Sequence, residues 1–210
     1  MFITDDESGE DWPTSLTDVQ VGGAFVRQEM TSFRWPQNIE ELALCGCENL
    51  TPEVLECIFI NEQLSTTLTR LAIHGSNRHM FADRDASSLA RLRNLKTLQI
   101  PIDLLYRLQL LPASDTFSPL IPIRELELTP SYDNDFTSKF VVEDLCRALR
   151  LNLSRVCSLG ISLECLELIP ESTFGKIDKW VWKNIDRCPE EELDSIFELG
   201  VYIIDPPALC

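Results

Sequence analysis

The sequence predicts an α/β fold in which a parallel β-sheet lines one side of a repeat array and helices line the other. Three observations predict it: a recurring apolar motif, its near-constant spacing, and helix signals between the copies. The motif reads apolar-x-x-apolar-x-apolar, and its last two apolar positions alternate as in a short strand with one buried face. Because a single copy cannot bury that face alone, neighbouring copies are expected to stack side by side.

Five copies of the motif occupy the centre of the chain. Their fourth positions, used here as markers, are Leu42, Leu71, Leu98, Leu126 and Leu166. The first three steps between markers are nearly equal in length (42 to 71, 71 to 98, 98 to 126). The last step, from 126 to 166, is clearly longer and predicts an insertion. Weaker copies at Leu16–Val21 and Leu199–Ile204 are expected to be divergent caps, because terminal repeats need a polar outer face.

Helix signals lie between successive copies. Thr51-Pro52 predicts a helix start, with a side-chain cap followed by proline at the first helical position. Leu55, Ile58 and Phe59 then fall on one face of that helix. Further helices are predicted over 87–92, 103–111 and 138–149. The strand-then-helix alternation therefore recurs from copy to copy.

The same signals divide the chain into four parts. An acidic tail that we expect to be disordered covers 1–12, a divergent first repeat covers 13–38, the repeats cover 39–171, and a helical cap with a terminal strand covers 172–210. The predicted cap helix carries Trp180 and Trp182, which cannot both face one core, since two residues turn a helix by about 200°. Either one tryptophan is an exposed anchor for a partner, or the two insert into different clefts of the cap.

The residue three positions after the last apolar residue is small in the first four copies: Cys47, Ser76, Asp103 and Ser131. The resulting pattern, apolar-x-x-Leu-x-apolar-x-x-Cys/Ser/Asp, resembles the leucine-rich repeat, and Ile39–Cys47 is the cleanest copy. The resemblance covers 39–171 and implies a leucine-rich-repeat solenoid, or horseshoe, with a concave parallel sheet and convex helices. The motif's asparagine is absent throughout, and the fifth copy has Glu171 at the small position.

The period of the repeat and the position of Cys47 are similar to the cysteine-bearing leucine-rich repeats of F-box substrate receptors and ribonuclease-inhibitor-like proteins. The chain resembles the repeat region of fungal F-box/LRR-type proteins, although no three-helix F-box pattern precedes the repeats. The resemblance implies a substrate-recognition role in a ubiquitin ligase. A Skp1-like adaptor would be a partner only if an F-box is present elsewhere.

Composition excludes several classes of partner. The 34 acidic and 18 basic residues give a net charge of −16, which disfavours binding to a phosphate backbone or an anionic membrane. No apolar run approaches the roughly 18 residues of a membrane span. The acidic N-terminus does not resemble a secretory signal, so we expect a cytoplasmic or nuclear protein whose eight cysteines are reduced.

The sequence predicts no catalytic residue, cofactor or metal ion, because phosphate loops and nucleophile-elbow motifs are absent from it. One chemical alternative remains. Cys45 and His74 occupy equivalent positions in consecutive copies, so they would lie on neighbouring strands about 4.8 Å apart. These two residues could act as a thiol enzyme, or they could form a metal site, to which Cys47 could add a third ligand. A third interpretation is a degenerate repeat protein without a dedicated partner.

The leading prediction is a non-enzymatic protein-binding module whose partner binds the concave face. In a leucine-rich-repeat solenoid, the variable residues between the core positions point to that face. The candidate partner-binding residues are therefore Glu41, Arg70, Thr97, Gln99, Glu125, Glu127 and Glu167. We expect Glu125, Glu127 and Glu167 to form a negative stripe on adjacent strands, which would favour a basic partner.

Overall fold

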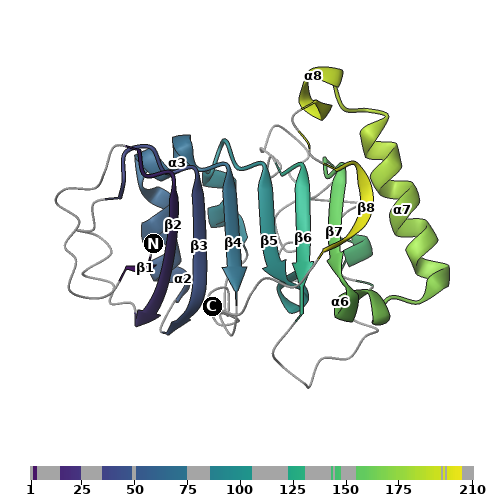
Figure 1. Cartoon of the computed structure of the whole chain (residues 1–210), viewed down its shortest axis with the longest axis horizontal. Coiled ribbons are helices and arrows are strands. Elements are labelled where there is room, and N and C mark those ends of the chain that lie inside the picture. Colours follow the sequence, from purple (N-terminus) through teal and green to yellow (C-terminus); the bar gives the residue numbers. More distant parts are fainter. Residues whose placement is uncertain are drawn as a thin grey trace.

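A computed structural model describes residues 2–3, 15–24, 35–48, 51–74, 86–105, 123–130, 143, 145–147, 155–194, 196 and 198–204. Within these ranges eight strands form one sheet, and every neighbouring pair is parallel. Each strand pairs with the next strand in the sequence, so the sheet order is β1 to β8 (Figure 1). The prediction of an α/β chain with a parallel sheet is confirmed.

The strands are β1 (Phe2–Ile3), β2 (Asp18–Ala24), β3 (Glu41–Glu48), β4 (Arg70–His74), β5 (Thr97–Pro101), β6 (Glu125–Thr129), β7 (Ser158–Ser162) and β8 (Gly200–Ile204). The α-helices are α2 (Pro52–Ile60), α3 (Glu62–Thr67), α6 (Leu163–Glu167), α7 (Glu171–Ile185) and α8 (Glu190–Leu193). Two 3-10 helices are η2 (Ala86–Arg91) and η3 (Ile102–Leu104). Helices α2 and α3 lie behind the sheet in Figure 1, and α7 lies beside β8.

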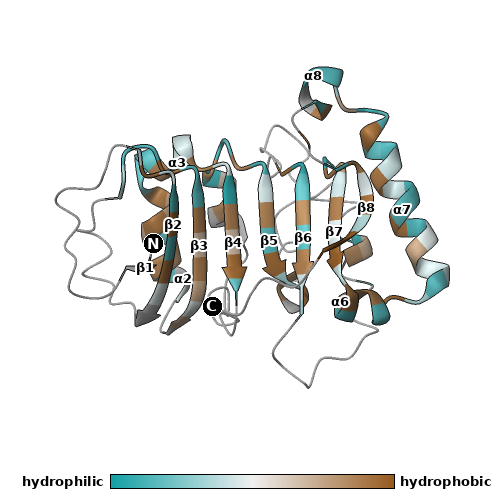
Figure 2. Ribbon diagram, viewed as in Figure 1, coloured by the Kyte–Doolittle hydropathy of each residue, from teal (hydrophilic) through white to brown (hydrophobic). Residues whose placement is uncertain are grey.

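The core forms where the repeat predicts it for the four central strands. Leu42, Leu71, Leu98 and Leu126 are mutual register partners along β3 to β6, and none is more than 1% exposed. Apolar residues therefore run across the middle of these strands (Figure 2). The first weak copy is a full member of the sheet, because Val19 of β2 pairs with Leu42.

The fifth predicted strand is wrong. Leu126 pairs with Leu159 of β7, which lies earlier in the chain than the predicted marker Leu166, and the predicted strand at 163–168 is largely helix α6. The Ser162 hydroxyl caps α6 by accepting a hydrogen bond from the Cys165 backbone N–H at 3.3 Å. Val156-x-x-Leu159-x-Ile161 also satisfies the repeat motif. A Leu-x-x-Leu pattern fits one face of a helix as well as a strand entry, which explains the error.

The ends of the sheet also differ from expectation. In β8 the register partner of Leu159 is Val201, so the expected marker Tyr202 is shifted by one residue and faces the other side of the sheet. At the start of the chain, Phe2–Ile3 pair with Gln20 and Val21, which differs from a tail disordered throughout 1–12. The rest of that tail lies outside the described residues.

The first predicted helix, α2, begins where its capping residues predict. The Thr51 hydroxyl accepts a hydrogen bond from the Val54 backbone N–H at 3.4 Å, and Pro52 occupies the first helical position. Leu55, Ile58 and Phe59 are fully buried. The predicted helix over 87–92 is the 3-10 helix η2, while the helices predicted over 103–111 and 138–149 lie mostly outside the described residues.

Cys47 occupies the small position of the repeat and links two strands. Its thiol donates to the Val21 carbonyl of β2 at 3.4 Å, and burial raises the pKa of the Cys47 thiol to about 12. The side chain packs within the hydrophobic core. Cys47 is therefore a structural thiol in this fold.

Cys47 is expected to react with iodoacetamide at pH 8 at least about tenfold more slowly than the half-buried Cys57. The reason is that a thiol with a pKa near 12 is almost entirely protonated at pH 8, and burial limits access. Peptide mass spectrometry of timed samples measures both rates, with urea-unfolded protein as the control for equal labelling. Similar rates in the folded protein would contradict the buried position.

Candidate functional site

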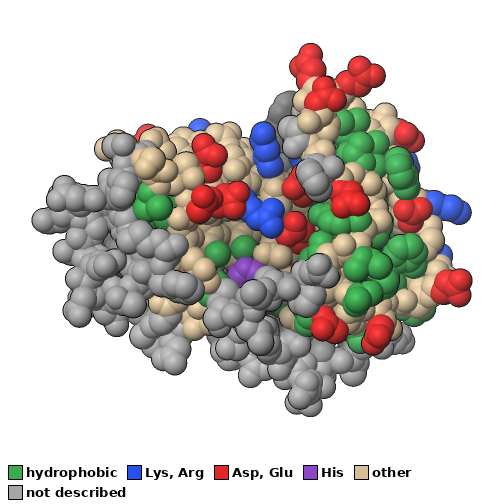
Figure 3. Space-filling model, viewed as in Figure 1, with side chains coloured by type: hydrophobic (Ala, Val, Ile, Leu, Met, Phe, Trp, Pro, Cys, Tyr) green, Lys and Arg blue, Asp and Glu red, His purple; other side chains and the backbone are tan. Residues whose placement is uncertain are grey.

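The face of the sheet opposite the core carries successive rows of side chains, and we call it the open face. Cys45 and His74 lie in a row near the strand ends, beyond the two rows given next. The first row, at the start of the strands, contains Asp18, Glu41, Arg70, Thr97, Glu125 and Ser158. The second row contains Gln20, Ala43, Ala72, Gln99, Glu127, Gly160 and Tyr202. The open face is turned to the viewer in Figure 3, where acidic side chains gather with basic side chains among them.

Six of the seven predicted partner-binding residues lie on the open face. The exception is Glu167, which is exposed on helix α6 and is not part of the sheet. The predicted stripe of Glu125, Glu127 and Glu167 is therefore wrong at its third member, because the motif places the fifth copy in the wrong register. The carboxylates that do share the face with Glu125 and Glu127 are Glu41 and Asp18.

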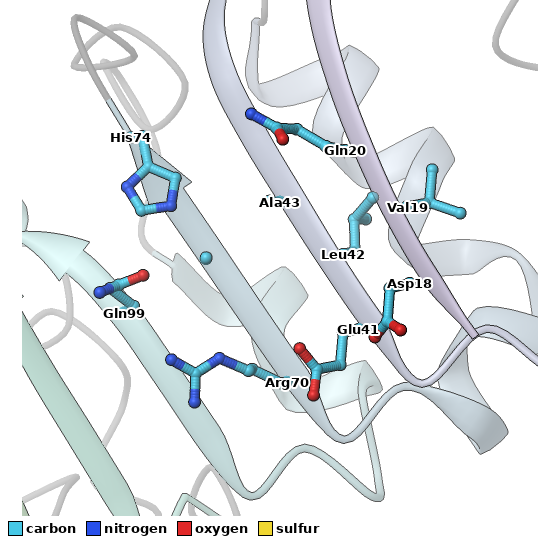
Figure 4. A pocket seen from close by; sticks show the side chains of 10 residues that line it. Asp18, Val19, Gln20, Glu41, Leu42, Ala43, Arg70, His74 and Gln99 are labelled. Atoms are coloured by element: carbon cyan, nitrogen blue, oxygen red, sulfur yellow. The ribbon is translucent and has the colours of Figure 1, made fainter. Parts of the chain in front are cut away.

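A hollow of about 280 Å³ opens on this face over β2 to β5 (Figure 4). The two small side chains Ala43 and Ala72 lie between the longer Gln20 and Gln99 in the second row, and this difference in size creates the depression. The residues lining it are Asp18, Val19, Gln20, Glu41, Leu42, Ala43, Arg70, Ala72, His74 and Gln99. Its surface is therefore apolar at the floor and polar at the walls.

Arg70 and Glu127 form an ion pair that spans three strands. The Nη2 atom of Arg70 on β4 donates to Oε2 of Glu127 on β6 at 2.8 Å, across the intervening β5. Burial raises the pKa of the Glu127 carboxyl, and Arg70 opposes that rise. Beside this pair, the Thr97 hydroxyl donates to the Glu125 carboxylate at 2.8 Å. The carboxylates of Glu125 and Glu127 therefore each have a hydrogen-bond or ion-pair partner within the sheet.

Two polar groups at the hollow are not satisfied in this way. The Glu41 carboxylate is exposed and makes no hydrogen bond or ion pair with a described residue. Gln99 is only 8% exposed, and its side-chain amide likewise finds no hydrogen-bond partner in the described part of the chain. Figure 4 shows Glu41 beside Asp18 at one end of the hollow, and Gln99 between Arg70 and His74. The site therefore has hydrogen-bonding capacity directed at solvent.

The predicted Cys45–His74 neighbours are adjacent, because they are register partners on β3 and β4. Burial lowers the pKa of His74, and the charge of Arg70 lowers it further, which favours a neutral imidazole. Cys45 is disulfide-bonded, which contradicts the expectation that every thiol is reduced. Its sulfur accepts a hydrogen bond from the Gln20 side-chain amide at 2.9 Å and is not a thiolate in this state.

Cys47 does not join that pair. Gly46 adopts a φ of +52° and is followed by Cys47 in the hydrophobic core, whereas Cys45 and His74 occupy the open face. The local irregularity breaks the strict alternation of strand side chains, so the i, i+2 spacing of the two cysteines does not put them on one face. Among the described residues, no group of three His, Cys, Asp or Glu side chains could hold a metal ion.

The C-terminal tryptophans differ in exposure. Trp182 is 48% exposed and Trp180 is half-buried, so the two do not both insert into clefts. The Trp182 ring lies over the start of β8, where a Cβ added to Gly200 would come within 3.3 Å of it. Gly200 has a φ of +91°, which suits glycine at this close approach.

Comparisons with protein-family models, with curated proteins and with solved structures find no match to this chain. The candidate site therefore rests on its own geometry. Among the described residues, no helix is long and apolar enough to cross a lipid bilayer.

Proposed function

We propose that the chain is a protein-binding module of the leucine-rich-repeat type, and that the partner binds the open face. The observation that carries the proposal is the hollow over β2 to β5, where Glu41 and the nearly buried Gln99 have polar atoms without partners in the described chain. Unused donors and acceptors beside an apolar floor are typical of a recognition surface.

The repeat assignment is supported by the succession of strands. Sequence neighbours are sheet neighbours throughout β1 to β8, and nearly equal steps along the chain separate the central markers Leu42, Leu71, Leu98 and Leu126. Such a succession is the arrangement of a solenoid, in which each unit contacts its neighbours and the concave face is free to bind. A horseshoe-shaped array with convex helices follows from this proposal.

The resemblance to fungal F-box/LRR-type proteins further implies the substrate-recognition part of a ubiquitin-ligase receptor in the cytoplasm or nucleus. The disulfide at Cys45 argues against those compartments, since disulfides persist mainly in oxidising ones. Co-purification with a Skp1-like adaptor tests the ligase role. Absence of the adaptor, with binding at the open face intact, would remove the ligase role and leave the binding module.

The binding role is tested with a displayed random-peptide library selected on the full chain. We expect selected peptides to lose at least about tenfold in affinity for Ala43→Trp, because the new side chain fills the hollow. The matched control is Glu62→Trp, which adds the same side chain to the exposed surface of α3 behind the sheet. Circular dichroism checks that both variants fold.

Two results would overturn the binding proposal. One is a selection that yields no peptide whose binding depends on the folded chain. The other is a set of peptides that bind Ala43→Trp as tightly as they bind the unaltered protein.

A further inference from the structure

We propose that the hollow on the open face is a subsite for one cationic side chain, an arginine or a lysine, presented by the partner. This inference rests on the proposed function, because it specifies what the binding face recognises. Four properties of the hollow favour such a ligand: its charge, its unpaired amide, its floor and its size.

The charge around the hollow is negative. Asp18 and Glu41 are register partners on neighbouring strands, so two carboxylates face each other at its edge. Like charges directly opposite on adjacent strands repel, and a cation between them removes that repulsion. Neither carboxylate has an ion-pair partner among the described residues, although the Thr17 hydroxyl donates to Asp18 at 3.0 Å. The edge of the hollow therefore offers two acceptors to a cation.

Arg70, the one Lys or Arg side chain among the described residues that line the hollow, does not cancel this charge. The guanidinium of Arg70 is bound to Glu127 at 2.8 Å, on the side of the hollow away from Asp18. Since Glu127 offsets the charge of Arg70, the lining retains the net charge of Asp18 and Glu41. His74, the other titratable group of the lining, is held toward its neutral form, because burial and Arg70 both lower its pKa.

Gln99 supplies the second, independent observation. Its side chain lines the hollow, is only 8% exposed, and has no hydrogen-bond partner in the described chain. The amide atoms of Gln99 remain in contact with solvent, because the buried side-chain polar atom without a partner in the described chain is the Ser158 hydroxyl, so a ligand in the hollow can reach the amide directly. The amide oxygen can accept an N–H from a guanidinium or an ammonium group.

The floor and the size of the hollow suit a single long side chain. Ala43 and Ala72 form an apolar floor against which the methylene stem of an arginine or lysine can pack. The volume of about 280 Å³ is near the lower limit of small-molecule pockets, which hold about 300 to 1,000 Å³. The hollow therefore fits one side chain better than a large cofactor.

The test titrates the isotope-labelled full chain with Ac-Gly-Gly-Arg-Gly-Gly-amide and follows the side-chain NH₂ signals of Gln99 by NMR. Its matched probe replaces arginine by citrulline, which has nearly the same shape without the charge. We expect the arginine peptide to shift the Gln99 signals and to bind about three- to tenfold more tightly than the citrulline peptide. The Gln99→Leu variant identifies the signals.

Protein variants locate the charge effect. Glu41→Gln and Asp18→Asn are each expected to weaken the arginine peptide about threefold. Glu167→Gln is expected to leave its affinity unchanged, because it removes the same charge from helix α6, which is not part of the open face. Added salt should weaken the arginine peptide more than the citrulline peptide.

Equal affinity for the arginine and citrulline peptides would overturn the subsite, as would preferential binding of the corresponding glutamate peptide beside Arg70. If library peptides still lost affinity for Ala43→Trp in that case, the binding module would stand without a cationic subsite. If no peptide depended on the open face, the proposed function itself would fail.

Discussion

Leu159→Ala is expected to lower the free energy of unfolding by about 2 to 5 kcal/mol, whereas Leu163→Ala should change it by less than about 0.5 kcal/mol. Leu159 is fully buried in β7 as the register partner of Leu126, so truncation removes apolar contacts and leaves a cavity. Leu163 is 55% exposed at the start of α6, where little is lost. The two substitutions are chemically identical and lie close together in the sequence.

Urea unfolding followed by circular dichroism measures both changes under the same conditions. The experiment decides between the two placements of the fifth strand, since the sequence motif alone puts Leu163 and Leu166 in the sheet. A large loss for Leu163→Ala and a small one for Leu159→Ala would contradict the register of β7. Ile60→Ala, at an exposed position of α2, is the control that shows how much the free energy of unfolding changes when a large apolar side chain is truncated at the surface.

The strands of the central repeats are predictable from the sequence, because the spacing between copies and the alternation of apolar residues within each copy indicate the same strands. Side chains of a strand point alternately to its two faces. Once one marker residue is correctly assigned to the core face, the faces of its neighbours in that strand follow. That is why the motif alone assigns six residues to the open face correctly: Glu41, Arg70, Thr97, Gln99, Glu125 and Glu127. With Leu166 as the fifth marker, the same rule places Glu167 on the open face, whereas Glu167 lies on helix α6.

The candidate binding residues predicted from the sequence do not include Asp18 and Gln20 of the hollow, although the sequence contains a signal for both. Asp18 and Gln20 occupy the third and fifth positions of the copy Leu16–Val21, which the motif indicates only as a cap. The Gly46 irregularity that separates Cys45 from Cys47 cannot be derived from spacing, because it is a local change of backbone conformation. The Arg70–Glu127 pair joins strands two apart, and its formation depends on side-chain conformations that a repeat pattern does not encode.

Arg70→Ala is expected to lower the free energy of unfolding at pH 8 by about 1.5 to 3 kcal/mol. The Glu127 side chain is only 12% exposed, so without Arg70 its carboxylate would be buried with no opposite charge. The 33% exposure of the Arg70 side chain keeps the loss below that of a fully buried ion pair. Glu125 and Glu41 are acidic neighbours that already raise the pKa of Glu127, which adds to the penalty.

The loss should depend on pH with a defined sign. Burial raises the pKa of Glu127 in the folded protein, so the folded state keeps this proton at pH values where the unfolded chain has lost it. Stability from this group is therefore present below the unfolded pKa of about 4.3 and falls as pH rises through the folded pKa. Removing Arg70 removes the influence that lowers this pKa, so the deficit of Arg70→Ala should be larger at pH 8 than at pH 5.

The double variant Arg70→Ala/Glu127→Gln separates charge from packing. If the buried carboxylate causes the loss, the neutral amide restores part of the stability at pH 8 and removes the extra deficit between pH 5 and pH 8. Urea unfolding of the single and double variants at both pH values measures this coupling. A deficit that is equal at the two pH values would show that the Arg70 side chain stabilises the open face through packing alone, which contradicts the role assigned to the ion pair.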